Sequence, residues 1–228
     1  MVQAALITGM ILLCTTTFAQ TKKIESENVG DGKKTGNTYL DLVLNLVSTN
    51  LNYGGSNADL TDYKKEALGI QAGVSFQAGI TSKFSLVSEF YFMTKGGKLK
   101  ADNPLTNNET THRLYVLELP VLARLHFGKF HVNAGPSIAY NLSATRKIAG
   151  ASTDLLFNNS SEGFKRFETS IQMGGGYTFQ VKQKRVALDL RYNYGLTNIS
   201  QDKEIRNRSF IVSMHFSPRW KTNPLGKN

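Results

Sequence analysis

The chain has 228 residues and a formal net charge of +10, and we expect one domain because no stretch resembles a linker between two globular cores. A basic balance is compatible with nucleic-acid binding. Lys and Arg are spread over the predicted turns, loops and tail, so the charge favours anionic lipid head groups as neighbours and argues against nucleic acid.

Residues 1–19 differ from the rest of the chain. An uncharged apolar run from Ala4 to Leu13 precedes Thr17 and Ala19, the small residues that signal peptidase requires. We predict a secretory signal peptide over 1–19 and an exported N-terminal segment over 20–37. About ten apolar residues are too few for a membrane-spanning helix, and Leu13 is too bulky for a lipoprotein site at Cys14. Since Cys14 is the only cysteine, the mature chain has no thiol chemistry.

The clearest pattern is a period of two between Leu68 and Ile80. Seven apolar residues occupy one parity, and Gly, Ser and Gln occupy the other. Side chains alternate across a strand, so the segment is predicted to be a strand with one apolar face and one small, polar face. Similar alternation predicts eight strands in all, over residues 39–47, 68–80, 84–95, 115–127, 130–142, 167–179, 186–197 and 209–216.

Two local features qualify these strands. Gly128 and Lys129 separate two of them and predict a type II′ hairpin turn, because glycine suits its first position. Pro120 and Pro136 lie inside strands and lack the N–H that a ladder requires, so we expect a bulge or local irregularity near each.

The connections between the strands alternate in length. Short links at 81–83, 128–129 and 182–185 alternate with long polar links at 48–66, 96–111, 145–163 and 198–208. In an up-and-down barrel every second connection lies at the same end. Outer-membrane barrels have short turns and both termini in the periplasm and long loops outside the cell, which is the orientation we expect.

The composition of the two faces indicates which one meets lipid. A soluble, lipocalin-like barrel with an apolar interior is the alternative, but the polar face here is mostly Gly, Ser, Gln, Asn and Thr, which suits a crowded lumen. Aromatic residues gather near the strand ends on the apolar face, as in interfacial girdles. We therefore predict an all-β fold, an eight-stranded antiparallel up-and-down transmembrane β-barrel over 38–217, with a periplasmic tail over 218–228.

The charged side chains within the strands fall on the polar face. An eight-stranded barrel is just wide enough for side chains to fill its lumen, so a wide pore is disfavoured, and buried charges must pair. We expect a structural network with Arg124 and Arg191 at its centre and acids as partners, while a proton or ion relay is the alternative. Its predicted members are Asp41, Glu89, Glu118, Arg124, Glu168, Asp189 and Arg191.

No motif for catalysis, cofactor binding or metal binding stands out in the sequence. The four histidines are scattered, which makes a metal site improbable. The close pair His215 and Ser217 lies at the predicted periplasmic end, away from the lipid of the outer leaflet. We therefore predict no enzyme activity, no cofactor and no metal.

The run from Tyr115 to Leu122 (YVLELPVL) and the later Asn133 to Ser137 (NAGPS), together with the signal peptide and the strand pattern, resemble the PorT-like outer-membrane β-barrel family of Bacteroidetes over residues 38–217. The resemblance implies a place in the outer membrane and proximity to secretion or envelope machinery, and it brings no catalytic residues. We expect a barrel that binds or scaffolds through its loops, with outer-membrane lipid and envelope or secretion-machinery proteins as partners. A narrow channel and a lipid-modifying enzyme are the alternatives.

Overall fold

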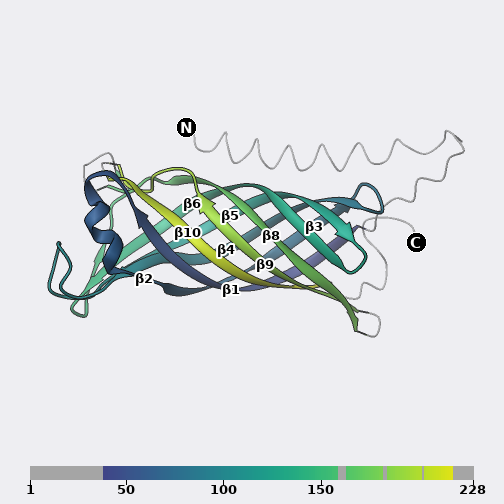
Figure 1. Ribbon diagram of the computed structural model, residues 1–228, viewed down its shortest axis with the longest axis horizontal. Helices are drawn as coiled ribbons and strands as arrows, with labels where there is room; N and C mark the ends of the chain where they lie inside the picture. Colours follow the sequence, from purple (N-terminus) through teal and green to yellow (C-terminus); the bar gives the residue numbers. More distant parts are fainter. Residues whose placement is uncertain (1–37, 159–162, 182–183, 202, 218–228) are drawn as a thin grey trace, which may run out of the picture. The chain divides into compact units, whose positions relative to one another are not determined.

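The computed structural model describes residues 38–158, 163–181, 184–201 and 203–217. The barrel strands are β1 (Tyr39–Tyr53), β3 (Ala67–Gly79), β4 (Phe84–Leu99), β5 (Thr110–Phe127), β6 (Phe130–Ile148), β8 (Phe167–Val181), β9 (Lys184–Gly195) and β10 (Ile205–Phe216). Each pairs antiparallel with the next, and β1 pairs with β10 and closes the ring (Figure 1). The predicted eight-stranded barrel is confirmed. Predictions for 1–37 and 218–228 lie outside the described residues.

Connections are sorted by length between the two ends of the barrel (Figure 1). At the short-turn end, Gly128 has φ +67°, whereas Lys129 is not among the residues with positive φ. A positive φ at only the first turn position is the type II′ geometry, as expected. No helix in the described part of the chain is both long and apolar enough to cross a bilayer.

At the loop end the strands are longer than predicted. β1 continues to Tyr53, β5 already begins at Thr110, and β6 continues to Ile148. The stretch between β1 and β3 contains a 3-10 helix, η1 (Gly55–Tyr63), and a short strand, β2 (Lys64–Lys65), that pairs with β4. A further short strand, β7 (Ala151–Asp154), pairs with β6. Most of 48–66, and most of 145–154, therefore form regular secondary structure rather than open loops.

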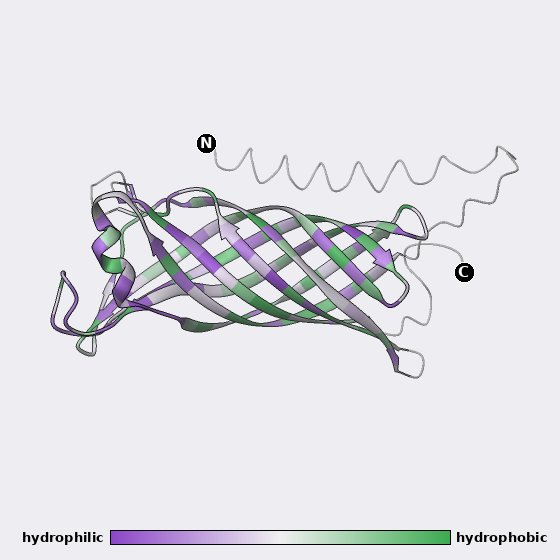
Figure 2. Ribbon diagram, viewed as in Figure 1, coloured by the Kyte–Doolittle hydropathy of each residue, from purple (hydrophilic) through white to green (hydrophobic). Residues whose placement is uncertain are grey.

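These strand extensions escaped prediction because the inner and outer faces exchange polarity toward the loop end of the extended strands. Toward the short turns Leu44 and Leu46 point outward, with 57% and 67% of their surface exposed, and Asn45 is buried. Beyond Ser48 the outward residues of β1 are polar, while the inward Leu51 and Tyr53 are buried. The period of two persists, but the apolar residues move to the inside. Figure 2 shows hydrophilic and hydrophobic residues alternating along the strands.

This reversal marks the edge of the hydrocarbon. A strand within lipid must be apolar outside, whereas the same strand in water must bury its apolar side chains inside. Tyrosines lie on the outer face near this reversal of polarity, and arginines cover two of them. The guanidinium carbon of Arg208 lies 4.9 Å from the ring centroid of Tyr194, and that of Arg166 lies 5.9 Å from the ring centroid of Tyr140. Aromatic and basic side chains favour this interfacial level.

Prolines interrupt the ladder without shifting it. Between β5 and β6 the paired residues pass from Pro120 and Ser137 directly to Ala123 and Ala134, so the pairing lapses in between while the register is kept. The expected irregularity near the prolines is present. The one register shift between these strands lies elsewhere, between Tyr115 and Val116.

Candidate functional site: the lumen network and the loop-side mouth

Asp189, on the inner face of β9, lies at the centre of a hydrogen-bonded network in the lumen. Its Oδ2 accepts hydrogen bonds from Arg124 and Arg191, each at 2.7 Å, and from Asn133 at 3.2 Å. Its Oδ1 lies 2.6 Å from Nε2 of His131. All of these side chains are buried. One carboxylate thus holds two guanidinium groups that come from different strands.

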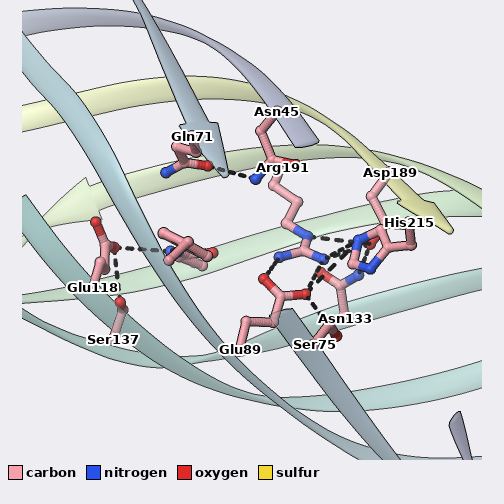
Figure 3. A network of polar contacts seen from close by, with 12 residues as sticks. Asn45, Gln71, Ser75, Glu89, Glu118, Asn133, Ser137, Asp189, Arg191 and His215 are labelled. Carbon is pink, nitrogen blue, oxygen red and sulfur yellow. Dashed lines mark hydrogen bonds and ion pairs between the residues drawn. The ribbon is translucent and has the colours of Figure 1, made fainter. Parts of the chain in front are cut away.

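Arg191 joins this centre to β4 on another part of the wall. Its two terminal nitrogens donate to Glu89 at 2.6 and 2.8 Å in a bidentate pair (Figure 3). The same guanidinium lies 3.0 Å from Nε2 of His215, and since a guanidinium has no acceptor, this imidazole nitrogen must accept. Gly174 leaves the space beside Arg191, because a Cβ there would lie 2.7 Å from the Arg191 Cα.

Toward the short turns, Arg185 donates to Asp41 at 2.6 Å and to Gln77 at 3.2 Å. Arg124 donates to the same Gln77 oxygen at 3.1 Å. The cations Arg124, Arg185 and Arg191 therefore face the acids Asp41, Glu89 and Asp189 in this half of the lumen. Such a balance compensates charges that would otherwise be costly to bury.

A second cluster lies nearer the loop end, centred on Lys95. Its ammonium group lies 3.2 Å from both Glu118 and Glu168. Glu118 also accepts from Ser137 and Gln172, and Glu168 accepts from Asn207. Glu118 does not reach either arginine, contrary to the sequence-based expectation, because six residues of strand, about 20 Å, separate it from Arg124.

The structure thus brings Glu89, Arg124, Asp189 and Arg191 together, joins Glu118 to Glu168 through Lys95, and attaches Asp41 through Arg185. Sequence reasoning missed Lys95, Arg185, His131 and His215 as members. Lys95 and His215 could have been predicted as members, because each alternates along its strand with the residues of the apolar face and so points into the lumen. Arg185 was assigned to a turn, and nothing local indicated that it reaches into the lumen.

An apolar cluster packs beside the Lys95 cluster, because Tyr91 and Ala139 pair with Glu118 across the ladders. Its buried members are Val47, Tyr91, Met93, Leu114, Val116, Ala139, Ala144 and Ile211, with Leu155 and Phe157 packed against them. A second cluster at the mouth contains Leu51, Tyr53, Leu60, Leu99, Phe164, Ile199 and Ile205. Interiors packed in this way leave few voids larger than a water molecule.

Above these clusters lies an open pocket of about 340 Å³ at the loop-side mouth. Its floor is apolar and includes Leu99 and Phe164, while His112, Arg146 and Lys203 add basic groups to its wall. His112 and Arg146 are direct partners across the β5–β6 ladder. Apolar walls with a few convergent polar groups are typical of ligand sites.

A serine and a histidine also meet at the short-turn end, where Ser85 Oγ lies 2.8 Å from Nε2 of His126. Ser85 is buried, and its hydroxyl also accepts from Gln77 at 3.4 Å. No carboxylate pairs with His126 within the described ranges, so the third member of a triad is missing. Among the described residues no group of His, Cys, Asp and Glu is arranged to hold a metal.

A family model described as the outer membrane protein beta-barrel domain matches residues 18–201. The chain belongs to this family. As a member of the outer-membrane barrel family it resides in the bacterial outer membrane, as predicted, and its outward apolar face therefore contacts lipid. No relative among curated proteins matches it.

Several solved outer-membrane barrels resemble this family member in shape. Neisserial surface protein A has 11% identity and a TM-score of 0.48, covering 80% of this chain and 99% of its own. Ail of Yersinia pestis, in complex with the heparin analogue sucrose octasulfate, has 9% identity and a TM-score of 0.45, with coverages of 78% and 97%. OprG of Pseudomonas aeruginosa has 12% identity and a TM-score of 0.37, with coverages of 82% and 95%.

Proposed function

We propose that this outer-membrane protein is a closed, non-catalytic barrel that acts by binding at its loop-side end. The observation that carries the proposal is the filled lumen. Inward side chains such as Asp189, Asn193 and Asn207 have no exposed surface, and two apolar clusters pack the loop-side half of the lumen. At the loop-side end, the mouth pocket and the elements around it remain accessible.

Conductance measurements separate this function from that of a narrow channel. In planar bilayers the purified protein is expected to give no discrete current steps, because a passing ion would have to break the bidentate Arg191–Glu89 pair and cross the apolar clusters, where a charge is strongly disfavoured. The triple variant Leu51→Ala, Leu99→Ala, Leu114→Ala thins the apolar clusters and serves as a control for their sealing role. Regular steps from the wild-type protein would exclude a closed barrel.

Binding at the mouth is supported by exposed apolar side chains beside it. Leu105 and Leu156 are 59% and 65% exposed, and both lie in the loop-side connections rather than on the lipid face. Contiguous apolar exposure outside lipid marks interaction surfaces. Outer-membrane, secretion-machinery or other envelope proteins are the partners we propose for this surface.

Crosslinking in intact outer membranes tests this surface. The variant Leu105→Ser, Leu156→Ser is expected to lose captured proteins that wild type retains, whereas Leu68→Ser, which changes the lipid face, is expected to keep them. Deleting 48–66 or 145–163 is unsuitable, because both segments contain barrel strand. Identical capture by all three proteins would contradict loop-side binding.

The absence of catalysis is also part of the proposal. The Ser85–His126 pair is the arrangement most like a catalytic one, and it lacks an acid partner and lies at the short-turn end. A lipid-release assay on purified protein is expected to detect no product.

The motifs at 115–122 and 133–137 support a place beside the PorT-like barrels of Bacteroidetes, and hence beside secretion or envelope machinery.

A further inference from the structure

The outer wall of the barrel carries a groove of about 610 Å³ just beyond the lipid face. It lies across β4, β5 and β6 and is bordered by the β6–β7 hairpin and by Asn108 and Glu109. Its floor is made of outward-facing strand residues, among them Lys98, Arg113 and Lys147. This groove is separate from the mouth pocket, because the two lie on opposite faces of the same strands.

Three cations surround one threonine in this groove. Thr111 pairs directly with Lys98 on one side and with Lys147 on the other. Arg113 is two residues along from Thr111 and so lies diagonal to Lys147, at a separation of about 7–8 Å. Gly96 faces Arg113 across the ladder.

The cations of the groove are only partly neutralised. Glu109 accepts from Lys65 at 3.2 Å and lies 3.7 Å from Lys98, and the hydrogen bond from Lys65 lowers the pKa of Glu109. Asp154 faces Thr145 from β7 but does not line the groove. Within the described residues neither Arg113 nor Lys147 has an ion-pair partner.

The groove is positioned at head-group level. Tyr115 forms its lower border, one step of the strand period below Arg113, about 7 Å, and it stacks on Phe92 with ring centroids 6.2 Å apart. From these rings toward the short turns, the same face presents exposed apolar side chains, including Phe90 and Leu86. A lipid whose acyl chains lie on this apolar surface would have its head group in the groove.

We propose that the groove formed by Lys98, Arg113, Lys147 and Thr111 binds the phosphate-bearing head group of a lipid in the leaflet at the loop end of the barrel. Basic side chains bind phosphate through charge-assisted hydrogen bonds, and arginine can do so with two parallel bonds. The Thr111 hydroxyl supplies a further donor. This site is independent of the proposed loop-side binding, since it faces the bilayer surface.

The test uses the full-length protein reconstituted in phosphatidylcholine vesicles that contain trace spin-labelled phosphatidic acid. Electron spin resonance measures how strongly the motionally restricted shell prefers this lipid to spin-labelled phosphatidylcholine. The variant Arg113→Gln, Lys147→Gln is expected to weaken the preference about thirtyfold, as follows from a loss of about 1 kcal/mol per cation. Arg113→Lys, Lys147→Arg is expected to retain most of it, because both charges remain.

A matched control removes two cations from the short-turn end, as Lys83→Gln, Lys129→Gln, and is expected to leave the preference unchanged. Equal losses in both double variants, or no loss in the groove variant, would overturn the site. A second arm adds excess inorganic phosphate. If free phosphate abolishes the preference, the groove binds soluble phosphate and the lipid assignment is wrong; if the preference persists, the lipid head group is the occupant.

Discussion

Arg191→Met is expected to destabilise the barrel by about 3–5 kcal/mol, because removing one partner of a buried ion pair leaves the other charge uncompensated. The side chain is fully enclosed and bonds Glu89 through two nitrogens and Asp189 through two. No water can replace these bonds without opening the lumen. Stability is measured in phosphatidylcholine vesicles as the urea concentration at which half of the protein is unfolded. Gel electrophoresis without heating separates the folded barrel from the unfolded protein.

The double variant Glu89→Gln, Arg191→Met is expected to recover part of this loss. It removes both members of the bidentate pair, while Asp189 keeps Arg124, His131 and Asn133 as partners. Arg208→Met is the control, because Arg208 lies outside over the ring of Tyr194 and its loss is expected to cost at most about 1 kcal/mol. If Arg191→Met were no worse than Arg208→Met, the network would not stabilise the fold.

Leu190→Arg is expected to cost about 2–4 kcal/mol, the cost of an arginine at the middle of the bilayer. Leu190 is half-exposed on the outer face of β9, between Val186 at the short-turn end of the strand and Tyr194 at the interface. A guanidinium there cannot reach water without distorting the lipid around it. The same urea unfolding measurement applies.

Leu196→Arg provides the matched comparison. It has the same parity on the outer face but lies beyond Tyr194, where an arginine costs about 0–1 kcal/mol. The difference between the two variants reports depth rather than the substitution itself. Equal costs at the two positions, or a wild-type protein that stays soluble without detergent, would contradict a lipid-facing outer wall.

Two strands show how far local patterning predicts this fold. In β3, the alternation from Leu68 onward gives the correct strand and the correct outer face, because neighbouring side chains alone set the period. In β1, the same reasoning ends the strand six residues too early. Beyond Val47 the apolar residues, Leu51 and Tyr53, lie on the inner face, so the outer face no longer shows an apolar pattern. The period of two continues through the whole strand, but at the edge of the lipid the apolar residues change from the outer face to the inner face.

The sequence by itself determined the strand count, the alternation and the sorting of short and long connections, because each depends on neighbouring residues. Only the tertiary structure decided which lumen charges meet. Arg191 and Glu89 are 102 positions apart, and their contact depends on how the registers of all the strands add up around the closed ring. The pairing of Glu118 with Lys95 rather than with an arginine follows from the same stagger. The height of each side chain along the barrel axis depends on the registers of all the strands in the closed sheet, so it cannot be read from one strand alone.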